Sequence, residues 1–334
     1  MTTINDIAKI ANVSKATVSK VINNYPGVKE ETKKHVLKVI KEQNYWPNSI
    51  ARSLSTNKSF IIGIFEPVKI NNFFFREVFE GIENVMGEEG YDILYFTNKL
   101  WEDSWLKFSF KEKCVNRGVD GVIMMGFGRV NLSEFDGLLN SNIPAVFVDL
   151  DLVGSNTSYV TSNNVEGAEM AIKYLAGLGH KKIAMIKGPI GFKLANDRFT
   201  GYQRTIHVLN LEYNPDWVFS GEYSIETGYN AINEILKMRN RPTAIFAEDI
   251  ISIGVMRGLK ENGLSVPDDF SLMGFDNIEL GRHYGLTTIN QDRNGLGEAA
   301  SRLLMDIINK KNFSPVVLPV ELIERDTCRQ IFNA

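Results

Sequence analysis

A short stretch near the amino terminus carries side chains suited to reading nucleic acid. On the outward face of a helix expected over residues 15–23 lie Lys15, Ala16, Ser19 and Lys20. Small side chains let a helix sink into the major groove of DNA, and lysine reaches base acceptors or phosphates. The pattern therefore predicts a DNA-contacting helix.

The chain lacks the residue patterns that support catalysis or cofactor binding. After one apolar run comes Gly126-Phe-Gly128, but Asn131 stands where a dinucleotide-binding fingerprint needs its third glycine. No phosphate-binding loop, nucleophile elbow or catalytic carboxylate pair is found. No metal-ligand spacing joins the histidines, which are His35, His180, His207 and His283. We therefore expect a protein that is not an enzyme and uses no cofactor or metal.

Charge is distributed unevenly along the 334 residues, whose net charge is -3. Residues 1–60 hold ten Lys/Arg and four Asp/Glu, a balance of +6, and residues 61–334 hold 27 and 36, a balance of -9. This basic N-terminal segment (the head) on an acidic remainder (the body) predicts that the head alone binds a polyanion. On charge alone, a solvated basic face is the commoner explanation.

Composition predicts a soluble globular protein, since apolar residues make up 44% of the chain and charged residues 23%. The length favours two or three domains. The longest apolar runs, such as Phe60–Phe65, are far shorter than the roughly 20 residues of a membrane span. The first residues do not resemble a secretory signal, and Cys114 and Cys328 are far apart. We expect a cytoplasmic protein without disulfides.

Three short helices are predicted in the first sixty residues. Thr3 is an N-cap candidate for an apolar helix that stops at Asn12, and Ser14 is the cap candidate for the helix over 15–23. Only two residues separate these helices, as in a helix-turn-helix. A third helix over about 30–43 supplies apolar residues that would close the core.

Beyond residue 60, apolar runs alternate with helical patterns. The predicted strands are Phe60–Phe65, Ile93–Phe96, Gly121–Met124, Ala145–Val148, Lys182–Ile186, Ala244–Phe246 and Ser271–Met273. The helical stretches include Arg76–Glu88, Val165–Leu178, Glu226–Leu236 and Ile253–Glu261. Such alternation implies parallel sheets covered on both faces, and the number of units favours two α/β subdomains. Ligands bind such sheets at the carboxyl ends of the strands.

Three N-terminal motifs resemble the headpiece of the LacI/GalR family of bacterial regulators: TINDIAKIANVSKATVSKVIN (3–23), VKEET (28–32) and YWPNSIARSL (45–54). The resemblance implies a helix-turn-helix headpiece over 1–47 and a hinge helix with its linker over 48–59. It also implies that Leu54 wedges into the DNA minor groove. The family most often has Arg where this chain has Lys20, which lacks the planar fork for guanine. The implied DNA contacts are Thr3, Ser14, Lys15, Ala16, Thr17, Ser19, Lys20, Asn23, Asn48, Ala51, Arg52 and Leu54.

Further motifs resemble the body of the same family, a type I periplasmic-binding-protein-like fold with parallel sheets. They include GVDGVI (118–123), LGHKKIA (178–184), RFTGY (198–202) and GFD (274–276). The resemblance implies an effector-binding and dimerisation body over 60–330. Its first subdomain would hold about 60–162 and 292–322, and its second about 163–291 and 323–330, with the ligand between them.

Carried over position by position, the candidate effector site contains Phe73, Phe74, Asp149, Arg198, Tyr223, Glu248, Asp276 and Gln291. Aromatic faces and paired polar groups suit a sugar. Glu248 stands where relatives usually have Asn or Ser, and this added carboxylate disfavours acidic or phosphorylated ligands. The alternatives are that Phe73 and Phe74 are core residues and that Asp149 is a turn residue.

The resemblance thus implies a transcription regulator, a repressor, that binds a pseudo-palindromic operator as a homodimer. A small ligand, expected to be a neutral sugar, would control its operator affinity. The sequence leaves open the ligand's effect on DNA binding, dimer against tetramer, and any protein co-effector. The alternative is a sugar-binding or sugar-acting protein with the same body. Such a protein would have no need for the basic head.

Overall fold

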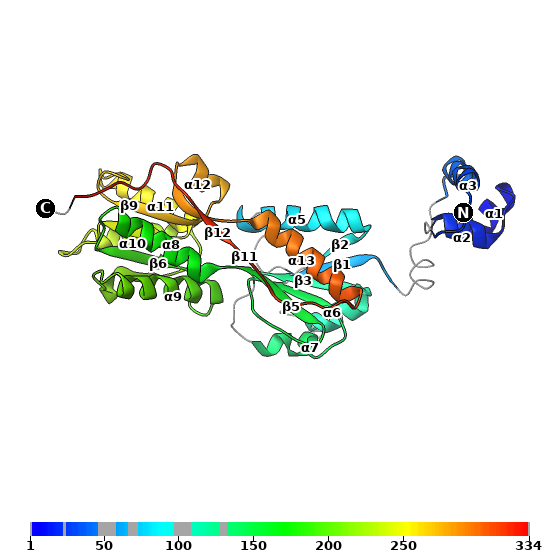
Figure 1. The fold of residues 1–334 in the computed structure, drawn as a ribbon, viewed down its shortest axis with the longest axis horizontal. Helices are drawn as coiled ribbons and strands as arrows, with labels where there is room; N and C mark the ends of the chain where they lie inside the picture. Colours follow the sequence, from blue (N-terminus) through cyan, green and yellow to red (C-terminus); the bar gives the residue numbers. More distant parts are fainter. Residues whose placement is uncertain are drawn as a thin grey trace. The chain divides into compact units, whose positions relative to one another are not determined.

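The computed structural model describes residues 2–22, 25–45, 58–65, 73–96, 108–126 and 132–332. Contacts divide the chain into two units, Met1–Phe60 and Ile61–Ala334 (Figure 1). Within the described ranges, no helix is long and apolar enough to cross a membrane. Outside them lie the predicted hinge helix and five predicted DNA contacts, namely Asn23, Asn48, Ala51, Arg52 and Leu54.

The first unit is a bundle of three helices, α1 (Ile4–Ile10), α2 (Lys15–Ile22) and α3 (Glu30–Glu42). Its apolar stripes meet in one core of Ile7, Ala8, Ala11, Val18, Val21, Val36 and Val39. Asn12 has a φ of 50°, a left-handed conformation that asparagine tolerates, and this residue ends the first helix within one turn. The predicted helix-turn-helix is confirmed.

The second unit contains two six-stranded sheets. The first has the order β11-β5-β4-β3-β1-β2, formed by β11 (Val316–Leu318), β5 (Thr157–Ser162), β4 (Ala145–Val148), β3 (Gly121–Met125), β1 (Ile61–Phe65) and β2 (Asp92–Phe96). The second has the order β12-β10-β9-β8-β6-β7, formed by β12 (Val320–Ile323), β10 (Thr287–Gln291), β9 (Ser271–Asp276), β8 (Ala244–Ala247), β6 (Ile183–Lys187) and β7 (Val218–Ser220). All neighbouring strands run parallel except β10 and β12. The predicted pair of parallel α/β subdomains is confirmed.

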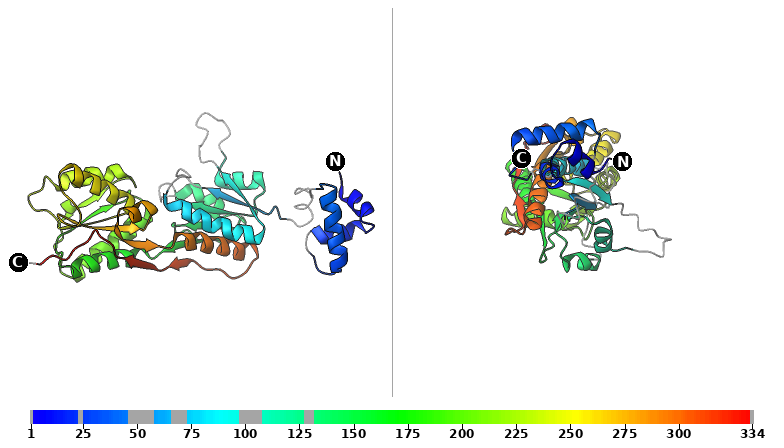
Figure 2. Two further views of the ribbon diagram at one scale, coloured as in Figure 1. Left: turned by 90° about the horizontal axis from the view of Figure 1, so that it is seen from above. Right: turned by 90° about the vertical axis from the view of Figure 1, so that its right-hand side faces the viewer.

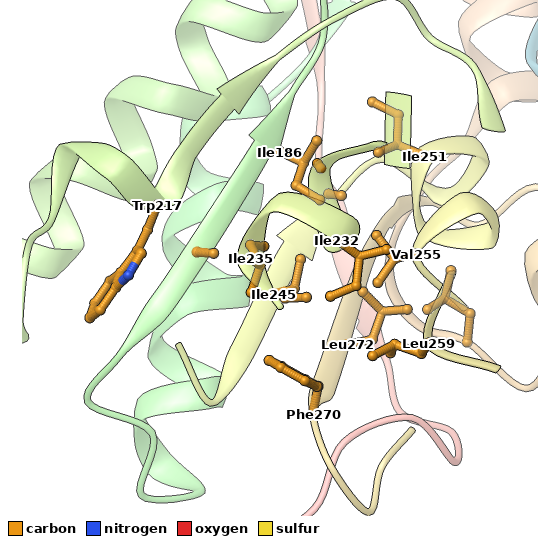
Figure 3. Close-up of a cluster of buried hydrophobic side chains, with 14 residues drawn as sticks. Ile186, Trp217, Ile232, Ile235, Ile245, Ile251, Val255, Leu259, Phe270 and Leu272 are labelled. Carbon is orange, nitrogen blue, oxygen red and sulfur yellow. The ribbon is translucent and has the colours of Figure 1, made fainter. Parts of the chain in front are cut away.

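Helices cover both faces of each sheet. The first sheet is covered by α5 (Phe73–Glu89) with α13 (Arg293–Ile308) and by α6 (Phe110–Arg117) with α7 (Asp136–Leu139) (Figure 2). The second is covered by α8 (Asn164–Gly177) with α9 (Lys193–Val208) and by α10 (Ile225–Ile235) with α11 (Asp249–Glu261). Shorter elements are α12 (Glu279–His283) and the 3₁₀ helices Leu132–Phe135 and Pro215–Trp217. Figure 3 shows the core under α10 and α11, where Ile232 and Val255 pack against strand residues.

Helices α5 and α13 approach each other closely because each presents a glycine at the contact. A Cβ at Gly81 would lie 2.1 Å from the backbone oxygen of Asn294, and one at Gly297 would lie 1.9 Å from that of Val78. Both distances are far inside van der Waals contact, so a side chain at either position would force the helices apart. Helix α13 of this pair begins directly after β10, where the chain crosses from the second sheet back to the first subdomain.

The chain passes between the two sheets after β5, after β10 and at Pro319 between β11 and β12. The predicted subdomain boundary at residue 322 is too late, because β12 pairs with β10, with Val320 opposite Gln291. The reason is local: Val316–Leu318 and Val320–Ile323 read in the sequence as one run, although they are the edge strands of different sheets. Two helices also begin three or four residues earlier than predicted, α5 at Phe73 and α11 at Asp249.

Candidate functional site

A cavity of about 260 Å³ lies between the two subdomains, at the carboxyl ends of their strands. The first subdomain contributes the start of α5 and the residue after β4. The second contributes α9, the start of α11, the loop after β7 and the end of β9. The lining residues are Phe73, Phe74, Phe75, Asp149, Leu194, Arg198, Tyr223, Ile250, Asp276 and Ile278. This is the edge of a parallel sheet at which ligands are expected.

Arg198 is the polar centre of the cavity and is 2% exposed. Its Nε donates to Asn164 Oδ1 at 2.9 Å, and its two Nη atoms donate to Glu248 Oε1 at 3.1 Å and Asp276 Oδ1 at 3.2 Å. The guanidinium also stacks on the ring of Phe275, 3.9 Å from its centroid. Burial alone would lower the pKa of Arg198, but the carboxylates of Asp276 and Glu248 raise it above its ordinary value. Arg198 is therefore a fixed cation with a fixed orientation.

Two carboxylate residues, Asp149 and Asp276, also line the cavity, and each has a positive φ. Asp149 follows β4 with a φ of 64°, and its Oδ1 accepts a hydrogen bond from Thr161 at 2.9 Å. Asp276 ends β9 with a φ of 114°, and its Oδ1 also accepts from Gln291 Nε2 at 2.6 Å. Burial raises the pKa of Asp149 to about 6, which leaves it mainly ionised near neutral pH. Burial also raises the pKa of Asp276.

Glu248 and Gln291 do not line the cavity but hold residues that do. Glu248 is the N-cap residue of α11 and is 1% exposed; burial raises its pKa, while the neighbouring Arg198 lowers it. Several buried polar atoms of the site have no hydrogen-bond partner among the described residues: Asp149 Oδ2, Glu248 Oε2, Gln291 Oε1 and the Tyr223 hydroxyl. Of these residues only Asp149 and Tyr223 line the cavity, so Asp149 Oδ2 is the unpaired carboxylate acceptor that a ligand there can reach.

The remaining predicted residues, Phe73, Phe74, Asp149, Arg198, Tyr223 and Asp276, come together in the cavity wall. Phe73 is 45% exposed and is therefore not a core residue. Sequence reasoning missed the apolar lining residues Phe75, Leu194, Ile250 and Ile278. Their residue types do not mark them as site residues. The sequence signal that could have found them is closeness along the chain, since each lies within four residues of a predicted site residue.

Comparison with known proteins identifies the family. Residues 3–48 match the family described as bacterial regulatory proteins, lacI family, and residues 172–328 match a periplasmic binding protein-like domain. The HTH-type transcriptional repressor PurR of Vibrio campbellii (strain ATCC BAA-1116) is 35% identical over 339 residues, which cover 99% of this chain and 100% of the relative. The chain belongs to the LacI family of bacterial regulatory proteins.

Solved structures of LacI-family members share this fold. The Lac repressor dimer bound to operator and the anti-inducer ONPF is 25% identical, with a TM-score of 0.79, over 98% of this chain and 99% of that one. A LacI-family regulator from Enterococcus faecium with bound ribose is 26% identical, with a TM-score of 0.70, over 81% of this chain and 100% of that one. Since the relatives are transcriptional regulators rather than enzymes, this LacI-family chain is a DNA-binding transcription regulator.

In the headpiece of this LacI-family chain, the predicted DNA-contacting residues divide into two groups. Lys15, Ala16 and Lys20 are exposed on α2. The hydroxyls of two others cap helices: Thr3 accepts from Asp6 N at 3.3 Å, and Ser14 accepts from Thr17 N at 3.0 Å and also lies 2.9 Å from the Thr17 hydroxyl oxygen. Ser19 is half-buried. The exposed lysines are thus the side chains best placed to reach DNA.

Proposed function

We propose that this protein represses transcription as a homodimer on a pseudo-palindromic operator, and that a sugar bound in the cavity controls its affinity for DNA. The observation that carries the proposal is the composition of the cavity wall. Aromatic side chains of α5 stand on the side of one subdomain, and the Arg198 centre stands on the side of the other. A sugar has both surfaces that such a wall recognises, because its C–H faces pack on aromatic rings while its hydroxyls bond charged groups.

The size of the cavity supports a small effector. A volume of about 260 Å³ is just below the roughly 300–1,000 Å³ of pockets that hold drug-sized ligands. A ligand of monosaccharide size suits this space. The structural relative with bound ribose supports the same ligand class.

The position of the cavity supplies a mechanism for control. A ligand there touches residues of both subdomains, so it binds the closed and open arrangements of the body with different affinities. Only such a difference allows a ligand to shift a conformational equilibrium. If the arrangement of the body also sets the spacing of two headpieces, ligand and operator change each other's affinity by the same factor.

The exposed lysines of α2 support the DNA-binding half of the proposal. Lys15 and Lys20 are both exposed on the second helix of a helix-turn-helix, which is the helix that enters the major groove. Lys20→Ala should reduce discrimination between operator bases, whereas a pure phosphate contact would weaken all sequences equally. The expected minor-groove wedge, Leu54, lies outside the described residues and stays a prediction from the sequence.

The test is a fluorescence-anisotropy titration of the full chain. Its operator would come from an unbiased selection of binding sequences, and the salt concentration would stay fixed because salt alone shifts such affinities by orders of magnitude. Panels of monosaccharides, sugar phosphates and purines would then be added to the complex. A specific complex altered by a monosaccharide supports the proposal. A response to purines or sugar phosphates, with none to any sugar, would overturn the ligand class and leave the DNA-binding function standing.

A further inference from the structure

Among the described residues, carboxylates outnumber cations around the cavity. Asp149, Asp276 and Glu248 all lie within the site, and Arg198 is the one described cation that lines it. Both Nη atoms of Arg198 are engaged by Glu248 and Asp276. Asp149 forms no ion pair with any of the residues that the structure describes, and its carboxylate accepts hydrogen bonds from neutral groups, the Thr161 hydroxyl and the backbone of Ser162.

The free oxygen of Asp149 requires a hydrogen-bond donor. Asp149 is 6% exposed, and its Oδ2 is buried with no partner within the described part of the chain. A buried acceptor left without a donor costs roughly 1–3 kcal/mol, and more when it is charged. Gln291 Oε1 and Glu248 Oε2 also lack a partner among the described residues, but neither residue lines the cavity. The ligand that best completes this site therefore donates a hydrogen bond to Asp149 Oδ2 and brings positive charge.

Building on the proposed function, we propose that the effector is an amino sugar whose ammonium group pairs with the Asp149 carboxylate. An ammonium has three donors and no acceptor, which is complementary to an unpaired carboxylate oxygen in a site where carboxylates outnumber cations. The aromatic side chains of Phe73, Phe74 and Phe75 line the same cavity and can add cation–π attraction. The sugar ring and its hydroxyls then face Arg198 and Asp276. This inference replaces the neutral sugar expected from the sequence with a cationic one.

The experiment compares sugars that differ only at one nitrogen. Isothermal titration calorimetry on the full chain would use D-glucosamine, D-galactosamine and D-mannosamine, each with its parent hexose and its N-acetyl derivative. The N-acetyl compound keeps the nitrogen and removes the charge. We expect at least one amino sugar to bind ten-fold or more tightly than both of its neutral counterparts. High salt screens charges and should lower this ratio. The decrease should be smaller than for an exposed ion pair, because the pair proposed here is buried.

Two variants assign the selectivity to one carboxylate. Asp149→Asn keeps the shape of the side chain, and asparagine tolerates the left-handed backbone at this position. It should bring the amino-to-neutral affinity ratio close to one. The matched control is Asp136→Asn, an exposed aspartate at the start of α7 in the same subdomain, which should leave the ratio unchanged.

The possible results separate this inference from the proposed function. If a hexose or its N-acetyl derivative binds as tightly as the amino sugar, the ammonium pairing is wrong while the sugar-controlled regulator stands. If none of the amino sugars binds, the inference is also wrong. If only ligands other than sugars bind, both proposals are overturned. Comparing amino sugars with their neutral counterparts on the wild-type protein is enough to test the ammonium pairing. Poor folding of Asp149→Asn would therefore not obscure the result.

Discussion

Glu77 of helix α5 and Arg293 of helix α13 form an ion pair, with 2.7 Å between Glu77 Oε1 and an Nη atom of Arg293. The Arg293 side chain is fully buried, and its guanidinium also donates to the backbone carbonyls of Asp276 and Asn277 in the other subdomain. Arg282, on α12, adds a weaker contact to Glu77 at 3.7 Å. The pair therefore ties the closely packed helices of the first subdomain to the strand end that presents Asp276 to the cavity.

Glu77→Gln should destabilise the fold. The substitution leaves a buried guanidinium without its carboxylate, and we expect a loss of about 1–3 kcal/mol, below the cost for a fully buried pair because Glu77 is 22% exposed. Urea unfolding of the full chain measures the loss. The matched control is Glu83→Gln, an exposed glutamate on the same helix, which should change stability little. Equal stability of the two variants would show that the pair does not hold the subdomains together.

Arg198→Lys should weaken the response to effector while preserving operator binding in its absence. A lysine ammonium cannot reach Asn164, Glu248 and Asp276 together, since it lacks the planar fork of arginine. We expect the effector concentration for half-maximal response to rise ten-fold or more, as measured by anisotropy with labelled operator. Arg204→Lys is the control, because Arg204 is exposed on the same helix. An unchanged response in Arg198→Lys would remove Arg198 from the effector site.

The sequence predicted the polar centre of the cavity better than its walls. Asp276 ends strand β9 and Arg198 lies in helix α9, and both carry charge, so their residue types signal a site. Leu194, Ile250 and Ile278 are ordinary apolar residues, and they reach the cavity only because of how the two subdomains meet. Strand β5, Thr157–Ser162, was missed for a similar reason, since its run of Thr and Ser lacks the apolar pattern of a buried strand. In both cases tertiary contacts, rather than the local sequence pattern, determine where the residues lie: the apolar side chains in the cavity wall and β5 in the sheet.

Asp249→Asn should flatten part of the dependence of stability on pH. Burial and the charge of Asp276 raise the pKa of Asp249 to about 8, while its oxygens accept from Thr288 at 2.6 Å and from Ile278 N at 2.9 Å. The folded state then binds a proton that the unfolded state has lost, so this group makes the free energy of unfolding fall as pH rises from about 4 to about 8.

An asparagine can keep both contacts without titrating. The wild-type protein should therefore lose stability relative to Asp249→Asn as the pH rises from about 5.5 to about 8. Urea unfolding of both proteins at several pH values gives the difference, in which the other titrating groups largely cancel. A difference that stays constant over this range would mean that Asp249 remains ionised in the fold.

His180 should give the opposite dependence on pH. Its Nδ1 lies 2.8 Å from the Thr243 hydroxyl oxygen and its Nε2 lies 2.9 Å from that of Ser271, and burial lowers its pKa. The neutral ring is the folded form, so its contribution to stability is present above about pH 6.5 and is lost as pH falls below that value. Protonation in the unfolded state drives this loss.

His180→Gln should therefore lower the melting temperature at about pH 7.5 and reduce the further drop between about pH 7.5 and pH 5. The control is His207→Gln, since His207 is exposed near the end of α9 and should leave the wild-type profile intact. Thermal unfolding followed by circular dichroism measures both variants. A drop in His180→Gln as steep as in the wild type would place the responsible group elsewhere.

Coupling between the cavity and DNA is tested most directly by measuring it from both sides. With the selected operator and the effector in hand, calorimetry gives the effector Kd with and without saturating operator. Anisotropy gives the operator Kd with and without saturating effector. We predict two factors that differ from one and agree with each other, as thermodynamic linkage requires. Effector binding abolished by Arg198→Ala, together with a factor of one in both directions, would contradict control of DNA binding by the cavity.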